Sequence, residues 1–306
     1  MRISILFFAV FFVFTSCKND SSSKSKMENS EATEESNKNS VIELVEVWST
    51  PDTLMTAEAV AFDAKNGIYY VSCINGVPPT EKDGDGYIAI LDQRGNIIDA
   101  KWIDGLDAPK GMTVRDGKLY VTNIDEFVVI DIESASIDKR IPVEGASFLN
   151  DVYAGAEGPV YFTDSNTNKI HMYDGDKVSL FVEDEKFGGP NGIYLDGNTF
   201  VVSGYGNGNV TTVNLDTKEV KIIGEGMIPS GDGVAKYKYG YFISNWNGEI
   251  YYVNDDWNAM KLIDTKAEKI NTADITFNAK NNELIVATFF DNRVVAYEPK
   301  MSYSEK

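Results

Sequence analysis

The segments Pro190-Asn191-Gly192-Ile193 and Gly231-Asp232-Gly233-Val234 are two copies of a short pattern that recurs along the chain. In each copy one residue, called the column residue below, precedes the aliphatic residues of a strand. The full set of column residues is Glu58, Lys110, Asn150, Asn191, Asp232 and Ala273, with spacings of 52, 40, 41, 41 and 41 residues. Self-similarity at this period predicts a repeat architecture.

Each repeat carries the same order of short apolar segments. After the column residue come an aliphatic segment, a turn with Gly, Asp or Asn, a second segment with an aromatic or aliphatic centre, a polar loop and a third segment. In the repeat that begins at Asn191, these segments are 193–195, 200–202 and 210–213. A fourth segment closes five of the six repeats. Four short strands per repeat predict an all-β, six-bladed β-propeller with four antiparallel strands per blade.

The two ends of the repeat region predict how the propeller closes. The sixth repeat ends after its third strand, whereas residues 41–48 form an additional strand before the first repeat. We therefore expect the N-terminal strand to complete the last blade, which leaves no open edge. A solenoid of stacked repeats is the structural alternative, but it has no use for this complementarity. The prediction is one domain of residues 41–300, followed by a short tail of residues 301–306.

The first 40 residues differ in composition from the rest. Residues 1–16 contain one Arg followed by a short apolar core, which is typical of a secretory signal peptide. Their junction with the next residue, Thr15-Ser16-Cys17, resembles a bacterial lipoprotein signal. The resemblance implies cleavage before Cys17, lipidation of Cys17 and export to a bacterial membrane, which we predict to be the outer membrane. An ordinary signal with an incidental cysteine is the alternative. The polar composition of residues 17–40 predicts a disordered tether that begins at the lipidated cysteine.

The overall charge excludes one class of partner. The formal net charge is −19, and nucleic-acid binding needs clusters of Lys and Arg, so we expect no nucleic-acid partner. An acidic surface fits neutral or cationic small molecules or bound divalent cations, although solubility in a salty environment explains it equally well. No stretch after residue 40 has the about 18 apolar residues that a membrane helix needs. We expect a monomer that meets the membrane through its lipid anchor.

Four column residues, Glu58, Asn150, Asn191 and Asp232, carry side-chain oxygen atoms. Because the first strand of a propeller blade lines the central channel, the column residues are expected to form a ring at one mouth of that channel. Two carboxylates and two amide oxygens suit a hard divalent cation such as Ca²⁺, whereas Zn²⁺ more often takes Cys or His ligands. Asn and Asp also concentrate at turns, but that alternative does not explain Glu58.

Residues 41–300 also resemble the calcium-dependent propellers of the gluconolactonase/regucalcin family, which is related to diisopropyl-fluorophosphatase and to paraoxonase-type lactonases. The matching residues are Glu58, Asn150-Asp151, Asn191-Gly192, Asp232-Gly233 and the run from Tyr241 to Gly248. The resemblance implies a Ca²⁺ site at Glu58, Asn150, Asn191 and Asp232. It also implies that Asp232 is a general base or nucleophile and that Asn150 holds the metal or the substrate. Long stretches of the chain resemble generic NHL-type propeller repeats as well.

The chain departs from the family at positions that contact the substrate. The sugar lactonases have an Arg two residues before the Asn of their Asn-Asp pair, and this chain has Phe148 there. The Gly-Pro that follows their first ligand is replaced by Ala59-Val60. The paraoxonase type uses two histidines, and the single histidine here is His171, which we expect at the surface. The metal site is therefore better supported than a sugar-acid substrate.

The loops between the second and third strands are expected at the same end of the blades as the column residues. They predict the wall of a pocket for a small-molecule substrate, formed by Asn123, Asp164, Tyr205, Trp246 and Phe289. Lys110 either neutralises a negative charge that develops on the substrate or balances the carboxylates of the ring. The first repeat has an insertion, residues 74–86, whose length and acidity predict a lid.

Two functional hypotheses follow from these patterns. The leading one is a calcium-dependent hydrolase that acts on a lactone or similar ester, with the cation polarising the substrate and Asp232 as base or nucleophile. The alternative is a non-enzymatic, NHL-like propeller that binds a partner or a carbohydrate and uses the metal for structure.

Overall fold

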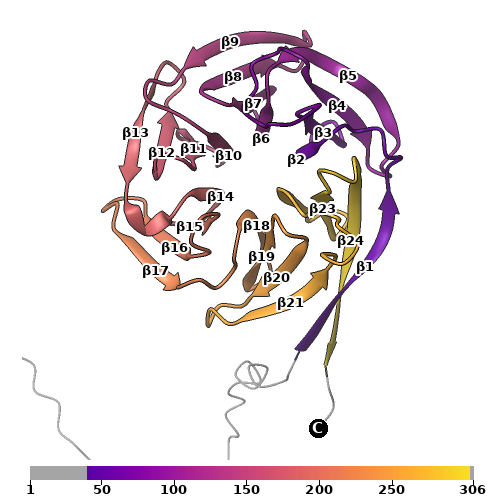
Figure 1. Ribbon diagram of the computed structural model, residues 1–306, viewed down its shortest axis with the longest axis vertical. Coiled ribbons are helices and arrows are strands. Elements are labelled where there is room, and N and C mark those ends of the chain that lie inside the picture. Colours follow the sequence, from indigo (N-terminus) through magenta and orange to yellow (C-terminus); the bar gives the residue numbers. More distant parts are fainter. Residues whose placement is uncertain (1–39, 304–306) are drawn as a thin grey trace, which may run out of the picture. The chain divides into compact units, whose positions relative to one another are not determined.

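Six four-stranded antiparallel sheets surround a central channel and form a six-bladed β-propeller (Figure 1). The computed structural model describes residues 40–303. Blades one to three comprise β2 (Ala57–Asp63), β3 (Ile68–Cys73), β4 (Gly86–Asp92), β5 (Ile97–Leu106); β6 (Pro109–Arg115), β7 (Lys118–Asn123), β8 (Glu126–Asp131), β9 (Ser136–Pro142); and β10 (Leu149–Ala154), β11 (Val160–Asp164), β12 (Lys169–Tyr173), β13 (Val178–Glu183). The predicted all-β propeller is confirmed.

The second half of the ring has the same plan. Blades four to six comprise β14 (Pro190–Asp196), β15 (Thr199–Gly204), β16 (Val210–Asn214), β17 (Val220–Gly224); β18 (Gly231–Tyr237), β19 (Gly240–Asn245), β20 (Glu249–Val253), β21 (Ala259–Asp264); and β22 (Ile275–Asn278), β23 (Glu283–Ala287), β24 (Val294–Tyr303), β1 (Ser40–Ser49). A short 3-10 helix, η2 (Glu185–Phe187), precedes β14. In Figure 1 the first strands of the blades lie nearest the channel and β5, β9, β13, β17 and β21 lie at the rim.

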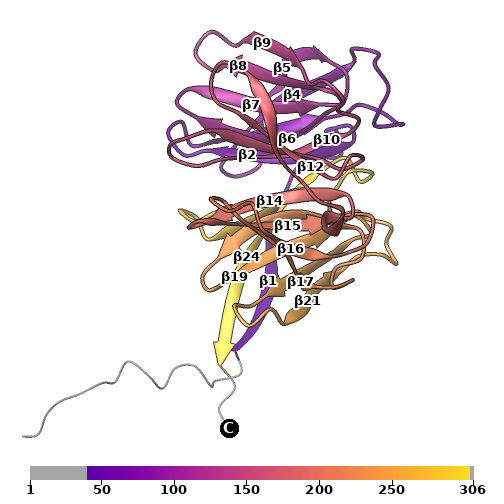
Figure 2. The ribbon, with the colours of Figure 1, turned by 90° about the vertical axis from the view of Figure 1, so that its left-hand side faces the viewer.

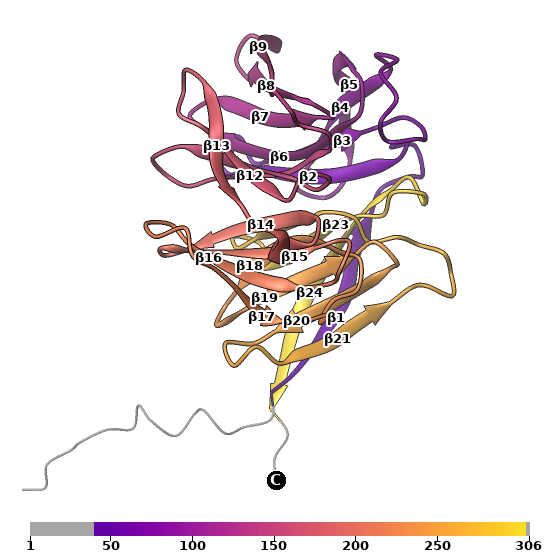
Figure 3. The same cartoon turned by 60° about the vertical axis from the view of Figure 1, so that its left-hand side comes forward.

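The N-terminal strand closes the ring as predicted. β1 pairs with β24 in the sheet order β1-β24-β23-β22, so the first strand of the chain becomes the outermost strand of the last blade. The two strands run side by side in both side views (Figures 2 and 3). Each has ten residues, and β24 extends to Tyr303, beyond the predicted boundary at residue 300. The predicted signal segment, Cys17 and the tether lie outside the described residues.

The hydrophobic core lies between neighbouring blades. Tyr70 of blade one packs against Met112 and Leu119 of blade two, and Tyr161 of blade three packs edge-on against Phe200 of blade four. The second and third strands are therefore buried on both faces, which explains why they read as apolar runs. The outer strands are mostly exposed, as in β9. Within residues 40–303, no helix is long and apolar enough to cross a membrane.

Candidate metal centre and substrate pocket

The column residues lie at irregularities of the inner strands. The pairing register with the second strand shifts at the start of each of the first five inner strands, within the intervals 57–59 in β2, 109–112 in β6, 149–152 in β10, 190–193 in β14 and 231–234 in β18. Such a bulge breaks the regular alternation of a strand and re-aims one side chain. Five column residues, from Glu58 to Asp232, are therefore released from the alternating pattern at the point where the blade reaches the channel mouth.

Glycine follows three column residues because the next blade approaches at that point. A Cβ atom on Gly192 would overlap the carbonyl oxygen of Asp232, and one on Gly233 would overlap the Asp274 carboxylate and the backbone nitrogen of Ile275. Gly111 meets the backbone of blade three in the same way. The Asn-Gly and Asp-Gly pairs lie inside strands β14 and β18, so turn chemistry does not account for them.

A ladder of hydroxyl groups fixes the backbone of the ring. Thr163 Oγ1 donates a hydrogen bond to Asn191 O at 2.9 Å and accepts one from Asp151 N at 3.0 Å. Ser244 Oγ makes the corresponding bond to Ala273 O at 2.7 Å. Thr122 and Ser203 reach the next column residue in the same way, and Ser72 accepts from Ala59 N. This ladder was not predicted from the sequence, although Ser or Thr recurs at that place in five second strands.

The four predicted metal ligands line one cavity of about 280 Å³ at the channel mouth. Glu58, Asn150, Asn191 and Asp232 are all between 2% and 6% exposed. Three of their oxygen atoms, Glu58 Oε2, Asn150 Oδ1 and Asn191 Oδ1, are buried and have no hydrogen-bond partner. Buried acceptors without a partner are rare because each one loses its hydration without compensation. Three of them facing one cavity indicate a binding site.

The orientation of Asn150 is set by a neighbouring hydroxyl. Its Nδ2 donates to Ser165 Oγ at 3.2 Å, and Ser165 Oγ donates in turn to Pro190 O at 2.7 Å. Because this bond uses the amide nitrogen, the Asn150 oxygen remains free toward the cavity. Among residues 40–303, no three His, Cys, Asp or Glu side chains gather into a metal-binding group. A cation here needs the amide oxygens as well, and such a mixed oxygen set fits a hard cation.

The centre of the channel is rich in carboxyl groups. Burial raises the pKa of Glu58 to about 7, although the nearby Lys110 ammonium opposes the shift. Burial, Glu58 and Asp274 together raise the pKa of Asp232 well above its ordinary value. Asp151 and Asp274 occupy the positions after their column residues, and burial raises the pKa of Asp274 to about 7. Burial and its carboxyl neighbours raise the pKa of Asp151 as well. Protons or a cation must compensate this cluster.

Lys110 lies behind the cavity wall. It is fully buried, and its Nζ donates to Pro79 O at 3.0 Å and to Ala108 O at 3.2 Å. The ammonium also lies 4.4 Å from the centre of the Phe148 ring. Burial lowers the pKa of Lys110 to about 8, while Glu58 opposes that shift. The structure therefore places Lys110 as a counter-charge to Glu58 and not among the residues that line the cavity.

Aromatic side chains form most of the cavity wall. Tyr205, Trp246 and Phe289 line it as predicted, and Phe148 joins them. Trp246 packs edge-on against Phe289 with ring centroids 4.5 Å apart. Phe148 stands where the sugar lactonases have an arginine, and its contribution to the wall was not predicted from the sequence.

Two predicted wall residues lie elsewhere. Asn123 is fully buried, and its Oδ1 accepts from Asp107 N at 3.1 Å and Ala108 N at 2.9 Å. Asp164 likewise accepts from the backbone nitrogens of Ser147 and Phe148. Each side chain holds the segment that leads into its own blade from the preceding one, and neither lines the cavity.

His171 is buried, contrary to expectation. It is 5% exposed and stacks on Phe162, with ring centroids 5.4 Å apart. Its Nε2 lies 3.9 Å from a carboxylate oxygen of Asp164. His171 pairs across strands with Phe162, whose ring stacks on Phe127 of blade two, so this side chain lies between two blades, which the strand pattern alone did not reveal.

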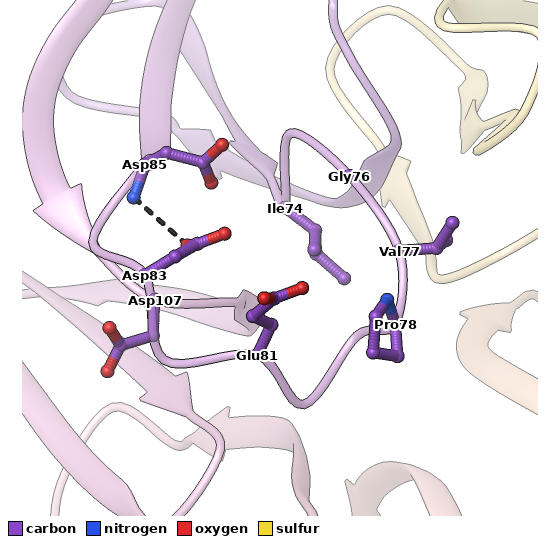
Figure 4. A pocket seen from close by; sticks show the side chains of 8 residues that line it. All are labelled: Ile74, Gly76, Val77, Pro78, Glu81, Asp83, Asp85 and Asp107. Carbon is purple, nitrogen blue, oxygen red and sulfur yellow. Dashed lines mark hydrogen bonds between the residues drawn. The ribbon is translucent and has the colours of Figure 1, made fainter.

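The insertion in blade one reaches the cavity with Pro79 and Thr80. Lys82 Nζ pairs with Asp125 of blade two at 2.6 Å, which ties the insertion to the neighbouring blade. A smaller hollow of about 50 Å³ is lined by residues of the insertion and by Asp107, namely Ile74, Gly76, Val77, Pro78, Glu81, Asp83, Asp85 and Asp107 (Figure 4). Asp83 Oδ1 accepts from Asp85 N at 3.2 Å.

Comparisons with known proteins support the fold. No protein-family model matches the chain, and no curated protein matches it. Among solved structures, a structural genomics target provisionally named a gluconolactonase has a TM-score of 0.63 at 13% identity, covering 86% of this chain and 97% of its own. An inactive variant of virginiamycin B lyase from Staphylococcus aureus with quinupristin has a TM-score of 0.59 at 12% identity, with coverages of 85% and 99%.

A third solved structure comes from a protein assembly. A chain of the nidogen/laminin complex has a TM-score of 0.61 at 14% identity and covers 78% of this chain and 97% of its own. At such low identities the likeness shows the fold alone. Because the same fold serves proteins as unlike as these, the function has to be argued from the site.

Proposed function

We propose that this protein is a calcium-dependent hydrolase of a lactone or similar ester. The observation that carries the proposal is the group of three unpaired, buried oxygens of Glu58, Asn150 and Asn191, which face the same cavity as Asp232. A divalent cation, most simply Ca²⁺, would be held by these four side chains and would polarise the carbonyl group of the substrate and stabilise the negative charge on its oxygen.

In this proposal Asp232 moves the proton. It accepts a proton from a water molecule as the water oxygen forms a bond to the carbonyl carbon. The bond between that carbon and the ring oxygen then breaks, and Asp232 returns the proton to the departing oxygen. The product is a hydroxy acid, and one water molecule has been consumed. A cation beside Asp232 favours its ionised form, which this role requires.

The other residues of the site bind and orient the substrate. Asn150, fixed by Ser165, presents its oxygen to the cavity. Phe148, Tyr205, Trp246 and Phe289 surround the substrate and exclude water. Lys110 balances the charge of Glu58 from behind the wall.

Turnover of a small panel of lactones in calcium and in a chelator tests the proposal. We expect calcium-dependent hydrolysis, and we expect Asp232→Asn to abolish it while leaving the fold intact. Asp255→Asn is the matched control because Asp255 is an exposed carboxylate on the turn between β20 and β21. A folded, calcium-loaded protein that is inert on lactones, esters and phosphotriesters would refute the enzyme hypothesis.

Binding without catalysis is the second candidate. It is favoured by two aromatic side chains, Tyr205 at 44% and Phe290 at 54% exposure. Tyr205 lines the cavity, and Phe290 packs against the wall residue Phe289. Exposed aromatic groups are typical of surfaces that bind a partner or a carbohydrate. Calorimetry that shows the same ligand affinity before and after Asp232→Asn, with no turnover, would support this function.

A further inference from the structure

We propose that the site accepts uncharged substrates that carry a flat, apolar ring and rejects both anionic and polyhydroxylated ones. This inference rests on the proposed function, because it names the substrate class of the same cavity. It is carried by the chemistry of the wall, by the shielding of the single nearby ammonium group and by the size of the cavity.

The floor and the wall of the cavity differ in character. The four ring residues supply the polar atoms of the floor. The rest of the lining is formed mainly by the apolar surface of Phe148, Tyr205, Trp246, Phe289 and Pro79, together with the polar residues Thr80, Ser165 and Asn166. The described residues that line the cavity include no Lys, Arg or His. An apolar wall over a polar floor binds a ligand whose reactive polar group points inward and whose remaining surface is apolar.

The aromatic wall is held rigidly. The loop of Trp246 is fixed by Trp246 N, which donates to Ser230 O at 2.9 Å, and by Trp246 O, which accepts from Asn271 Nδ2 at 2.7 Å. Phe289 has a φ of 36°, an unfavourable conformation for a bulky residue. Its backbone nitrogen donates to Ala57 O, next to Glu58. The fold thus keeps a strained aromatic residue beside the ring, and strain of this kind concentrates at functional sites.

An anionic substrate group finds no cationic side chain among the described residues that line this cavity. The ammonium of Lys110 is used by the carbonyl oxygens of Pro79 and Ala108, and the Phe148 ring lies against it. Phe148 lines the cavity, whereas Lys110 does not, so the ring separates the ammonium from the substrate. The carboxylates of Glu58 and Asp232 already balance the two charges of a divalent cation at the ring, so a substrate anion would add a net negative charge in the low-dielectric channel.

The wall also disfavours a sugar. A polyol buried against the aromatic side chains loses hydrogen bonds to water that these side chains cannot replace. Of the polar wall residues, Ser165 and Asn166 already use their hydroxyl and amide groups in bonds to Asn150, Pro190 and Ser147. The volume of about 280 Å³ is at the small end for ligand pockets. It therefore suits a ligand of one or two rings, and the edges and faces of Trp246 and Phe289 suit a flat one.

A matched set of lactones tests the inference on the full chain in calcium. Phthalide is a neutral, flat aromatic lactone, 5-carboxyphthalide differs from it by one negative charge, and D-glucono-1,5-lactone is neutral but polyhydroxylated. We expect kcat/KM for phthalide to exceed that for each of the other two by at least about tenfold. A preference for the carboxylate or for the sugar lactone overturns the inference while leaving the hydrolase proposal standing.

Binding of isoindolin-1-one, the lactam analogue of phthalide, separates recognition from catalysis. We expect calorimetry to show binding that weakens about tenfold in Trp246→Ala, since an aromatic contact and its buried area are lost. Tyr239→Ala is the control, because Tyr239 is 78% exposed on the turn between β18 and β19, at the opposite end of the same blade. Absence of lactam binding, or equal loss in both variants, overturns the inference even if lactones are hydrolysed.

The Phe148→Arg variant tests whether a cation added to the cavity makes the site accept an anionic substrate. An arginine there offers a cation to the cavity, so we expect the preference for phthalide over 5-carboxyphthalide to fall by about tenfold or more. If no lactone is turned over, the same comparison is made by binding of isoindolin-1-one and its carboxylate derivative. An unchanged preference in this variant, when it is folded by circular dichroism, contradicts the role assigned to Phe148.

Discussion

Replacing Asn191 with leucine should stabilise this protein in a chelator and destabilise it, relative to the wild type, in calcium. Asn191 is 3% exposed and its Oδ1 has no hydrogen-bond partner. An unsatisfied buried acceptor costs about 1–3 kcal/mol. Leucine is of similar size and removes that cost, so we expect Asn191→Leu to gain about 1 kcal/mol without metal. For a domain of this size, that corresponds to a rise of about 2–4 °C in Tm.

In calcium the wild type should be more stable than Asn191→Leu, which is the reverse of their order in a chelator. A ligand that binds only the folded state at 100 times its Kd stabilises that state by about 2.7 kcal/mol. The wild type should therefore rise by about 5–10 °C in Tm, whereas the variant, with one of four oxygen ligands removed, should rise much less. Differential scanning calorimetry in EDTA and in calcium measures both effects.

Asn123→Leu provides the matched control. Asn123 is also a buried asparagine, but its Oδ1 accepts two backbone hydrogen bonds, from Asp107 and Ala108. Loss of the Asn123 carboxamide should destabilise the protein by about 2 kcal/mol or more in both buffers and should leave the calcium-induced rise in Tm unchanged. If Asn191→Leu destabilises equally in EDTA and in calcium, the unpaired oxygen is not a ligand and the reasoning fails.

Three further predictions follow from the ring. Gly192→Ala should lower the free energy of unfolding, measured by urea denaturation, by about 3 kcal/mol or more, because the added Cβ overlaps backbone atoms. Gly76→Ala, with open space around the added Cβ, should leave that free energy nearly unchanged. Lys110→Met should speed thermolysin cleavage within residues 74–86 about tenfold, because the insertion loses its buried ammonium donor, while Lys82→Met, which breaks an exposed pair, should change it little. In EDTA the free energy of unfolding should fall as pH rises from about 4 to about 7, because native Asp274, with its pKa raised to about 7, still holds a proton that the unfolded chain has released. A stability that rises over that range would contradict the burial of this carboxyl group, and calcium should oppose the fall.

The repeat could be predicted from the sequence because a propeller repeats its local structure. The position of Asn191 relative to Asp232 is set by one blade, and one blade is one period of the chain. The same period predicted that β1 would complete the last blade. The convergence of Glu58, Asn150, Asn191 and Asp232 on one cavity follows from ring closure, which the strand count had already indicated.

Contacts between blades could not be predicted in the same way. The distance between Lys110 and Pro79 depends on how the insertion of blade one folds over blade two, and no periodicity encodes that path. Likewise, Asn123 and Asp164 end the second strands of blades two and three at the channel mouth, but their carboxamide and carboxylate groups accept hydrogen bonds from backbone nitrogens of the segment that leads into the same blade. A polar side chain at a loop can serve either the ligand or the backbone, and its residue type does not distinguish the two.

The construction of the ring separates the residues that keep the fold from those that set its chemistry. At Asn191 the backbone is fixed by the following Gly192 and by the hydroxyl of Thr163 from the preceding blade. Glycine follows two further column residues, and a hydroxyl from the preceding blade also reaches the backbone of Asn150, Asp232 and Ala273. The column side chain itself takes no part in either contact, so Glu, Lys, Asn, Asp and Ala all occur in one ring. A propeller built in this way can change its ligands without changing its closure. For that reason the shared fold of proteins at 12–14% identity carries no function, and the unpaired oxygens of this chain's own ring are the feature from which its function has to be inferred.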